Sequence, residues 1–130
     1  YTAELEAACS VAHDRGAPCT NGGLVSKLVA LLVYHDARRA GDLGRAERIA
    51  RAAFTPEERA DLDWVRAQEQ IGKGEALLAS YRPAGADYVN FHWYVADREV
   101  LADAVAFLAC RSSRTRSARS RTIRATRQPS

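Results

Sequence analysis

A single run of β-forming residues, at positions 86–94, stands among segments whose apolar residues have helical spacing. The run is rich in aromatic and branched residues, which favour extended structure. Strand alternation places Val89, Phe91 and Trp93 on one face. The opposite face then carries Tyr88, Asn90, His92 and Tyr94. We therefore predict a strand over residues 86–94.

A second, shorter strand is predicted over residues 17–24, where turn-forming residues lead into the loop Asn21-Gly22-Gly23. Helical segments separate the two strands, so they cannot form a hairpin and should be parallel. The predicted helices span residues 2–15, 25–40, 43–54, a segment starting at Thr55-Pro56-Glu57-Glu58 and running through Trp64, residues 76–81, and residues 97–109.

The chain is too short for the complete fold that this order of elements suggests. Two parallel strands need further strands beside them and helices on both faces. A whole (β/α)8 TIM barrel takes roughly 250 residues, whereas this chain has 130. The predicted fold class is therefore α/β, mostly helical with two parallel strands, as an incomplete segment of a (β/α)8 barrel. Tyr1 at the start and the absence of Met predict a processed product or a fragment.

Charge divides the chain in two. Residues 111–130 contain seven arginines and no acidic residue. Because the whole chain carries +3 and this segment contributes +7, residues 1–110 carry −4. We place a boundary near Cys110, between a partial barrel segment (1–110) and an Arg/Ser-rich tail (111–130) that is predicted to be disordered.

Cysteine, metal and membrane signals are weak. Cys9, Cys19 and Cys110 have neither zinc-site nor disulfide-framework spacing, so buried apolar roles are expected. No phosphate-binding glycine loop, nucleophile elbow or metal-ligand cluster is present, and no cofactor is predicted. No apolar run reaches the ~18 residues of a membrane span.

Candidate binding residues follow from the strand ends, because parallel α/β proteins bind ligands at the carboxyl ends of their strands. The candidates are Asn21, Asn90, His92, Trp93 and Tyr94. Imidazole and phenol groups can hydrogen-bond a hydroxyl or carboxylate, and an indole can stack on a sugar ring. The alternative is that His92 and Tyr94 are partly buried structural residues and that Asn21-Gly22-Gly23 is an ordinary turn.

Residues 84–94, Ala-Gly-Ala-Asp-Tyr-Val-Asn-Phe-His-Trp-Tyr, carry a resemblance to a known family. This segment resembles the sixth-strand region of barrel glycoside hydrolases of the large retaining clan, where the strand often ends in His-x-Tyr. The resemblance implies that residues 17–24 are the fifth strand. It also implies hydrolysis by two carboxylates, a proton donor after strand four and a nucleophile at the end of strand seven. Neither carboxylate can be assigned in this chain.

A shifted reading frame accounts for the tail. Permitted codons for residues 111–124, read from the last base of a TGC codon for Cys110, encode Pro-Val-Val-Thr-Asn-Glu-Ile-Gly-Gln-Ile-Glu-Asp-Asp-Pro. This would be an apolar strand followed by Asn-Glu, as the resemblance requires at strand seven. We therefore expect residues 111–130 to be out of frame, with the nucleophilic Glu lost.

The predicted function is that of an inactive fragment of a glycoside hydrolase, whose parent binds a carbohydrate substrate. Neither a membrane nor a nucleic acid is the expected partner. The alternative is a small helical interaction domain whose basic tail binds nucleic acid through salt-sensitive phosphate contacts.

Overall fold

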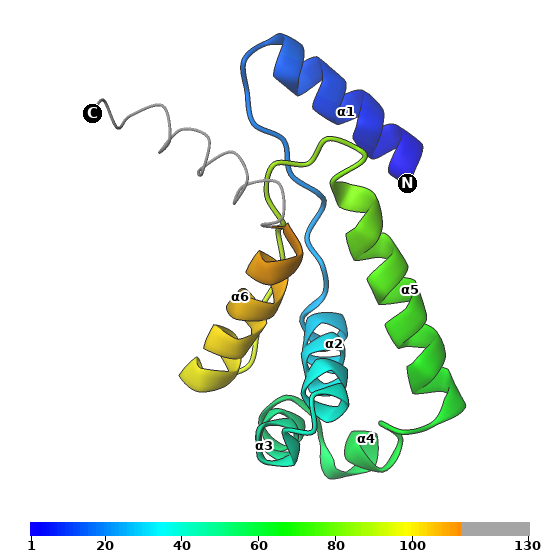
Figure 1. Cartoon of the computed structure of the whole chain (residues 1–130), viewed down its shortest axis with the longest axis vertical. Helices are drawn as coiled ribbons and strands as arrows, with labels where there is room; N and C mark the ends of the chain where they lie inside the picture. Colours follow the sequence, from blue (N-terminus) through cyan, green and yellow to red (C-terminus); the bar gives the residue numbers. More distant parts are fainter. Residues whose placement is uncertain (113–130) are drawn as a thin grey trace, which may run out of the picture.

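The computed structural model describes residues 1–112 of the chain (Figure 1). Its six helices are, in order, α1 (Thr2–Asp14), α2 (Ser26–Arg39), α3 (Leu43–Ala53), α4 (Pro56–Ala60), α5 (Val65–Tyr81) and α6 (Arg98–Ser112). Extended chain joins α1 to α2 and α5 to α6. Helices α3 and α4 lie at one end of the molecule, and α1 lies at the other end, beside the last turns of α5 (Figure 1).

Helix α2 is the centre of the packing, with α3, α5 and α6 against it. A helix that is apolar over most of its circumference needs neighbours on several sides. Val29, Leu32 and Val33 of α2 are at most 1% exposed, and Ile49 of α3 and Val100 of α6 are fully buried. The core therefore lies among these four helices, as the strongly apolar sequence of residues 25–40 indicates.

The helix start at Thr55 is confirmed. The Thr55 hydroxyl accepts a hydrogen bond from the Glu58 amide (3.2 Å), and the Glu58 carboxylate accepts one from the Thr55 amide (2.9 Å). This reciprocal capping box satisfies two amides that have no partner within the helix, and Pro56 occupies the first turn. Lys27 of α2 also donates to Glu58 and so joins the start of α4 to α2. This bond, together with the one from the Thr55 amide, lowers the pKa of the Glu58 carboxyl.

The predicted helix bounds between Thr55 and Tyr81 are wrong. Helix α4 ends at Ala60, and α5 then runs without a break from Val65 to Tyr81, through both Gly72 and Gly74. Gly74 is buried, and a Cβ there would lie 3.0–3.2 Å from methyl groups of Leu28 and Leu32. Close packing of α5 on α2 thus accounts for the glycine at position 74, inside a helix.

The predicted α/β fold class is also wrong, because residues 1–112 are helical and contain no strand or sheet. Only two isolated parallel bridges form, Thr20 with Tyr88 and Leu24 with Phe91. Between them, side chains take the place of ladder bonds: the Thr20 hydroxyl donates to the Tyr88 carbonyl (3.0 Å), and the Asn21 amide group bonds the Asn90 backbone. Side-chain bonds of this kind compete with a regular ladder, and the two segments remain extended chain rather than strands.

The cysteine prediction needs a correction. Cys9 and Cys19 are buried, as expected, but they form a disulfide, with their Cα atoms 5.2 Å apart. Gly16 ends α1 with a φ of +73°, a left-handed conformation that suits glycine. The chain reverses there and returns Cys19 to Cys9, so a ten-residue spacing becomes a contact. Cys110 is exposed.

Helix α6 continues to Ser112 and passes the predicted boundary at Cys110. The remainder of the predicted tail, residues 113–130, lies outside the described residues. Within residues 1–112, no helix combines the length and the apolarity needed to cross a bilayer.

Candidate functional site

The two extended segments that carry the candidate residues lie side by side. The Leu24 amide donates to the Asn90 carbonyl (3.0 Å), and the His92 amide donates to the Leu24 carbonyl (2.8 Å). The segments run in parallel, as predicted for them. The structure therefore brings the loop Asn21-Gly22-Gly23 next to residues 90–92.

Asn21 connects the two extended segments at the point where they meet, which we call the junction. Its side chain is 2% exposed. The Nδ2 group donates to the Asn90 carbonyl (3.0 Å), and Oδ1 accepts from the Asn90 amide (2.7 Å). The carboxamide thus acts as a substitute peptide group, with one donor and one acceptor on the same backbone residue. In this arrangement the Asn21 side chain positions Asn90 and does not face solvent.

Glycine at position 23 makes room for His92. A Cβ on Gly23 would lie 2.2 Å from the His92 Nε2 atom, a distance at which atoms overlap. The imidazole therefore rests directly on the backbone of the glycine loop. The imidazole also stacks with the Tyr94 ring, with centroids 6.3 Å apart and planes 16° from parallel. Tyr94 is 82% exposed, so the stacked pair forms a flat aromatic surface open to solvent.

Trp93 points to the other side of the segment. Exposure alternates along residues 88–95, and Val89, Phe91 and Trp93 are half-buried against the core, as the predicted alternation requires. The Trp93 ring meets the Phe91 ring edge-on, with centroids 6.2 Å apart. Its Nε1 atom is buried and has no hydrogen-bond partner among the described residues. Trp93 therefore does not share the open surface of His92 and Tyr94.

Tyr81, the last residue of α5, lies next to Asn21 and is 3% exposed. Burial, assisted by nearby Tyr1, raises the pKa of the Tyr81 hydroxyl to about 12, and a hydrogen bond with Asn21 opposes this rise. The hydroxyl is therefore protonated at neutral pH. Asn21 thus connects the candidate surface to α5.

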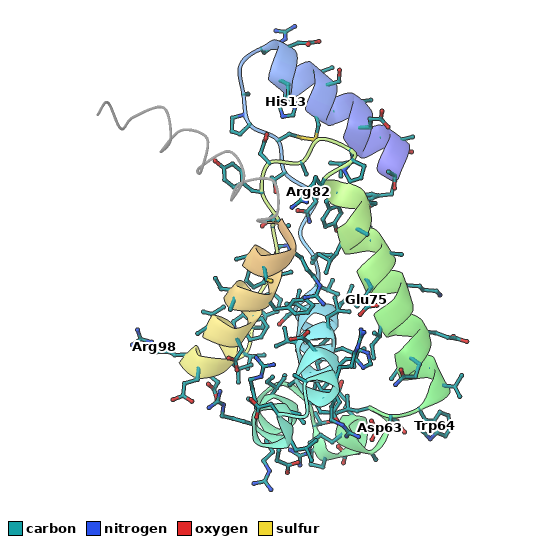
Figure 2. The ribbon with its side chains drawn as sticks, in the orientation of Figure 1. His13, Asp63, Trp64, Glu75, Arg82 and Arg98 are labelled. Atoms are coloured by element: carbon teal, nitrogen blue, oxygen red, sulfur yellow. A yellow bond between two sulfur atoms is a disulfide. The ribbon has the colours of Figure 1, made fainter. Side chains whose placement is uncertain are left out.

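Sequence reasoning missed a second polar feature, the pair formed by His13 and Asp87. His13 Nε2 lies 2.8 Å from Asp87 Oδ2, and the same oxygen accepts from the Cys19 amide (2.9 Å). The pair borders a groove of about 770 Å³ between the end of α1, the end of α5 and the start of the second extended segment. Figure 2 shows His13 and Arg82 at this end of the molecule, far from Asp63 and Trp64. A separation of 74 residues leaves no local sequence signal for this contact.

No group of three or more His, Cys, Asp or Glu side chains within residues 1–112 could hold a metal ion. What the open surface of His92 and Tyr94 offers a ligand is hydrogen bonds from an imidazole and a phenol group, together with a flat aromatic face. Comparison with protein families, curated proteins and solved structures finds no match to this chain.

Proposed function

We propose that the chain is the substrate-binding part of a glycoside hydrolase, in which His92 and Tyr94 bind a sugar. The observation that carries this proposal is the stacked, solvent-open pair of these two rings on the Asn21-Gly22-Gly23 loop. Sugars present hydroxyl groups around their rings and apolar C–H faces above and below. A flat aromatic surface bordered by an imidazole and a phenol complements both features.

The local architecture supports binding better than catalysis. The Asn21 side chain holds Asn90 through two hydrogen bonds to its backbone, and Gly23 holds His92 through close contact. Hydrolysis of a glycosidic bond needs two carboxyl groups, about 5 Å apart when configuration is retained. The proposal assigns neither to residues 1–112. In the proposed parent enzyme, this chain therefore orients the sugar, and other segments supply the acid and the nucleophile.

The alternative frame of the tail gives further support. Read one base earlier, residues 111–124 can encode an apolar strand followed by Asn-Glu, which would supply a nucleophile that we do not assign within residues 1–112. We expect sequencing of the source DNA through codon 110 to reveal the shift. The same Arg-rich tail in independent isolates would contradict it.

Binding can be tested by NMR on the 130-residue protein. Titration with glucose, xylose, mannose, cellobiose and xylobiose is expected to shift the His92 and Tyr94 ring resonances for at least one sugar, with millimolar affinity. His92→Ala and Tyr94→Ala should each weaken binding about tenfold, the equivalent of ~1.4 kcal/mol. Gly23→Ala should weaken it similarly, because the new methyl group must displace the imidazole.

Trp64 provides the matched control. It is also an exposed aromatic residue (66%), and it lies just before α5, at the end of the molecule opposite His13 (Figure 2). Trp64→Ala should leave binding unchanged. Unshifted His92 and Tyr94 resonances at saturating concentrations of every sugar would contradict the proposed site. Turnover of an aryl glycoside by this chain would contradict its assignment as a non-catalytic part.

A second candidate function rests on the seven arginines of residues 111–130. If they bind nucleic acid, affinity for a DNA duplex of arbitrary sequence should fall steeply with salt, with a log–log slope of about −0.9 per phosphate contacted. Removal of residues 111–130 should abolish the affinity. Binding that survives this removal, or that does not depend on salt, would rule this function out.

A further inference from the structure

The Cys9–Cys19 disulfide joins α1 to the extended segment that follows it. Apart from this bond, α1 is held by few interactions. Leu5 and Cys9 are its only buried residues, and its main packing partner among the described helices is the end of α5. Figure 1 shows α1 at one end of the molecule, away from α3 and α4. Leu5 and Cys9 belong to the buried core, but most core residues lie on α2, α3, α5 and α6.

The remaining contacts of α1 are mostly at the surface. The Tyr1 hydroxyl accepts a hydrogen bond from the Gly22 amide (3.0 Å). The His13–Asp87 pair is also exposed, with about two-fifths of each side chain open to solvent. Exposed ion pairs contribute at most about 1 kcal/mol. These contacts are therefore weak compared with a covalent bond.

Cys19 connects the disulfide to the second extended segment. The Asp87 amide donates to the Cys19 carbonyl (2.7 Å), and the Cys19 amide donates to the Asp87 carboxylate (2.9 Å). The backbone at Gly85 also lies against Cys9, since a Cβ there would be 3.3 Å from the Cys9 Cβ. One sulfur bridge thus holds α1 against both extended segments, next to the groove that His13, Gly85 and Asp87 help to line.

We propose that this disulfide is a reversible redox latch, and that reduction by a dithiol releases α1 and opens the groove while α2–α6 stay folded. The thiolate of the dithiol attacks the Cys19 sulfur, which is the more exposed of the two, and Cys9 leaves as a thiolate. The second thiol then displaces Cys19 and closes the reductant into a cyclic disulfide. The protein gains two electrons and two protons, and the dithiol loses them.

The expected size of the effect follows from the loop that the bond closes. The two cysteines are ten residues apart. A disulfide that closes a loop of this length removes conformational freedom that the chain regains on reduction. This changes the equilibrium between docked and released α1 by about a hundredfold. Disulfides persist in oxidising compartments and are reduced in cytosol-like conditions. The position of α1 would therefore follow the redox state of the protein's surroundings.

Hydrogen exchange measured by mass spectrometry on the full chain tests the latch. The Cys110→Ser variant is the reference, because alkylation should then label no thiol before reduction and two after it. Dithiothreitol should accelerate amide exchange in residues 2–14 by about a hundredfold and leave residues 26–39 and 43–53 unchanged. Re-oxidation should restore the slow exchange.

The triple variant Cys9→Ser/Cys19→Ser/Cys110→Ser is the second measurement. It should show fast exchange in α1 with or without dithiothreitol. Equal exchange of α1 in the oxidised and reduced proteins would overturn the proposal. Loss of protection in α2 and α3 on reduction would also overturn it, because the bond would then support the whole fold rather than α1 alone.

Discussion

Replacing Leu32 with alanine is expected to lower the free energy of unfolding by about 3 to 5 kcal/mol. Leu32 is 1% exposed and lies at the interface where α5 crosses α2. Truncation removes three carbon atoms from a packed core and leaves a cavity that rigid neighbours fill only in part. Urea denaturation followed by circular dichroism measures the loss as a lower midpoint with an unchanged slope.

A matched control and a double-mutant cycle sharpen this prediction. Leu43 is 63% exposed, and Leu43→Ala should change stability by less than about 0.5 kcal/mol. Gly74→Ala adds a methyl group 3.1 Å from Leu32, a contact that the Leu32→Ala background removes. The two substitutions should therefore be less destabilising together than their separate effects predict, and the helix-propensity gain of alanine cancels in the cycle. Additive effects would show that Gly74 and Leu32 do not pack against each other.

The second large effect is a loss of stability between about pH 10 and pH 12. Burial raises the pKa of the Tyr81 hydroxyl from its ordinary value of 10.0 to about 12, so the folded state favours the protonated form. This stabilisation is fully present below pH 10, and it is lost as the pH rises through 12, because only the unfolded chain ionises readily in that range. A rise of this size corresponds to about 2 to 3 kcal/mol. Urea midpoints measured at intervals from pH 9 to 12 follow the loss.

Tyr81→Phe is the decisive comparison, since it keeps the buried ring and removes the ionisable group. Its stability is expected to fall less over this pH range, even if its value at neutral pH is lower because the hydrogen bond with Asn21 is gone. Tyr88 is 52% exposed, and Tyr88→Phe should retain the pH dependence of the native chain. Identical pH profiles for the native chain and Tyr81→Phe would disprove the assignment.

Helices with strong local signals were predictable. Thr55 and Glu58 satisfy each other's amides at a helix start, where Pro56 has no N–H to satisfy. Gly16 and Gly41 both adopt the positive φ expected at helix ends. The continuity of α5 was not predictable, because the reason for Gly74 lies in Leu28 and Leu32, more than forty residues earlier. The same holds for the disulfide, which depends on how the chain turns after α1 rather than on a cysteine motif.

The extended segments show a mixed outcome. Their parallel direction and the alternation of exposed and half-buried residues over 88–95 follow from the sequence pattern. The predicted strands do not form, because Thr20 and Asn21 use side-chain groups where a ladder would use backbone groups. The β-strand propensity of residues 86–94 accounts for their extended backbone. A sheet also requires neighbouring strands, which propensity alone does not supply.

The carboxamide of Asn21 has a further consequence for the alignment of these segments. Two of its hydrogen bonds are made to the backbone of Asn90, and these two select one pairing register. A slip of one residue would turn every side chain of an extended segment to the opposite face. His92 and Tyr94 would then face the core, and Phe91 and Trp93 would face solvent. A single buried amide, itself hidden from any ligand, thereby decides which aromatic rings the protein presents to its surroundings.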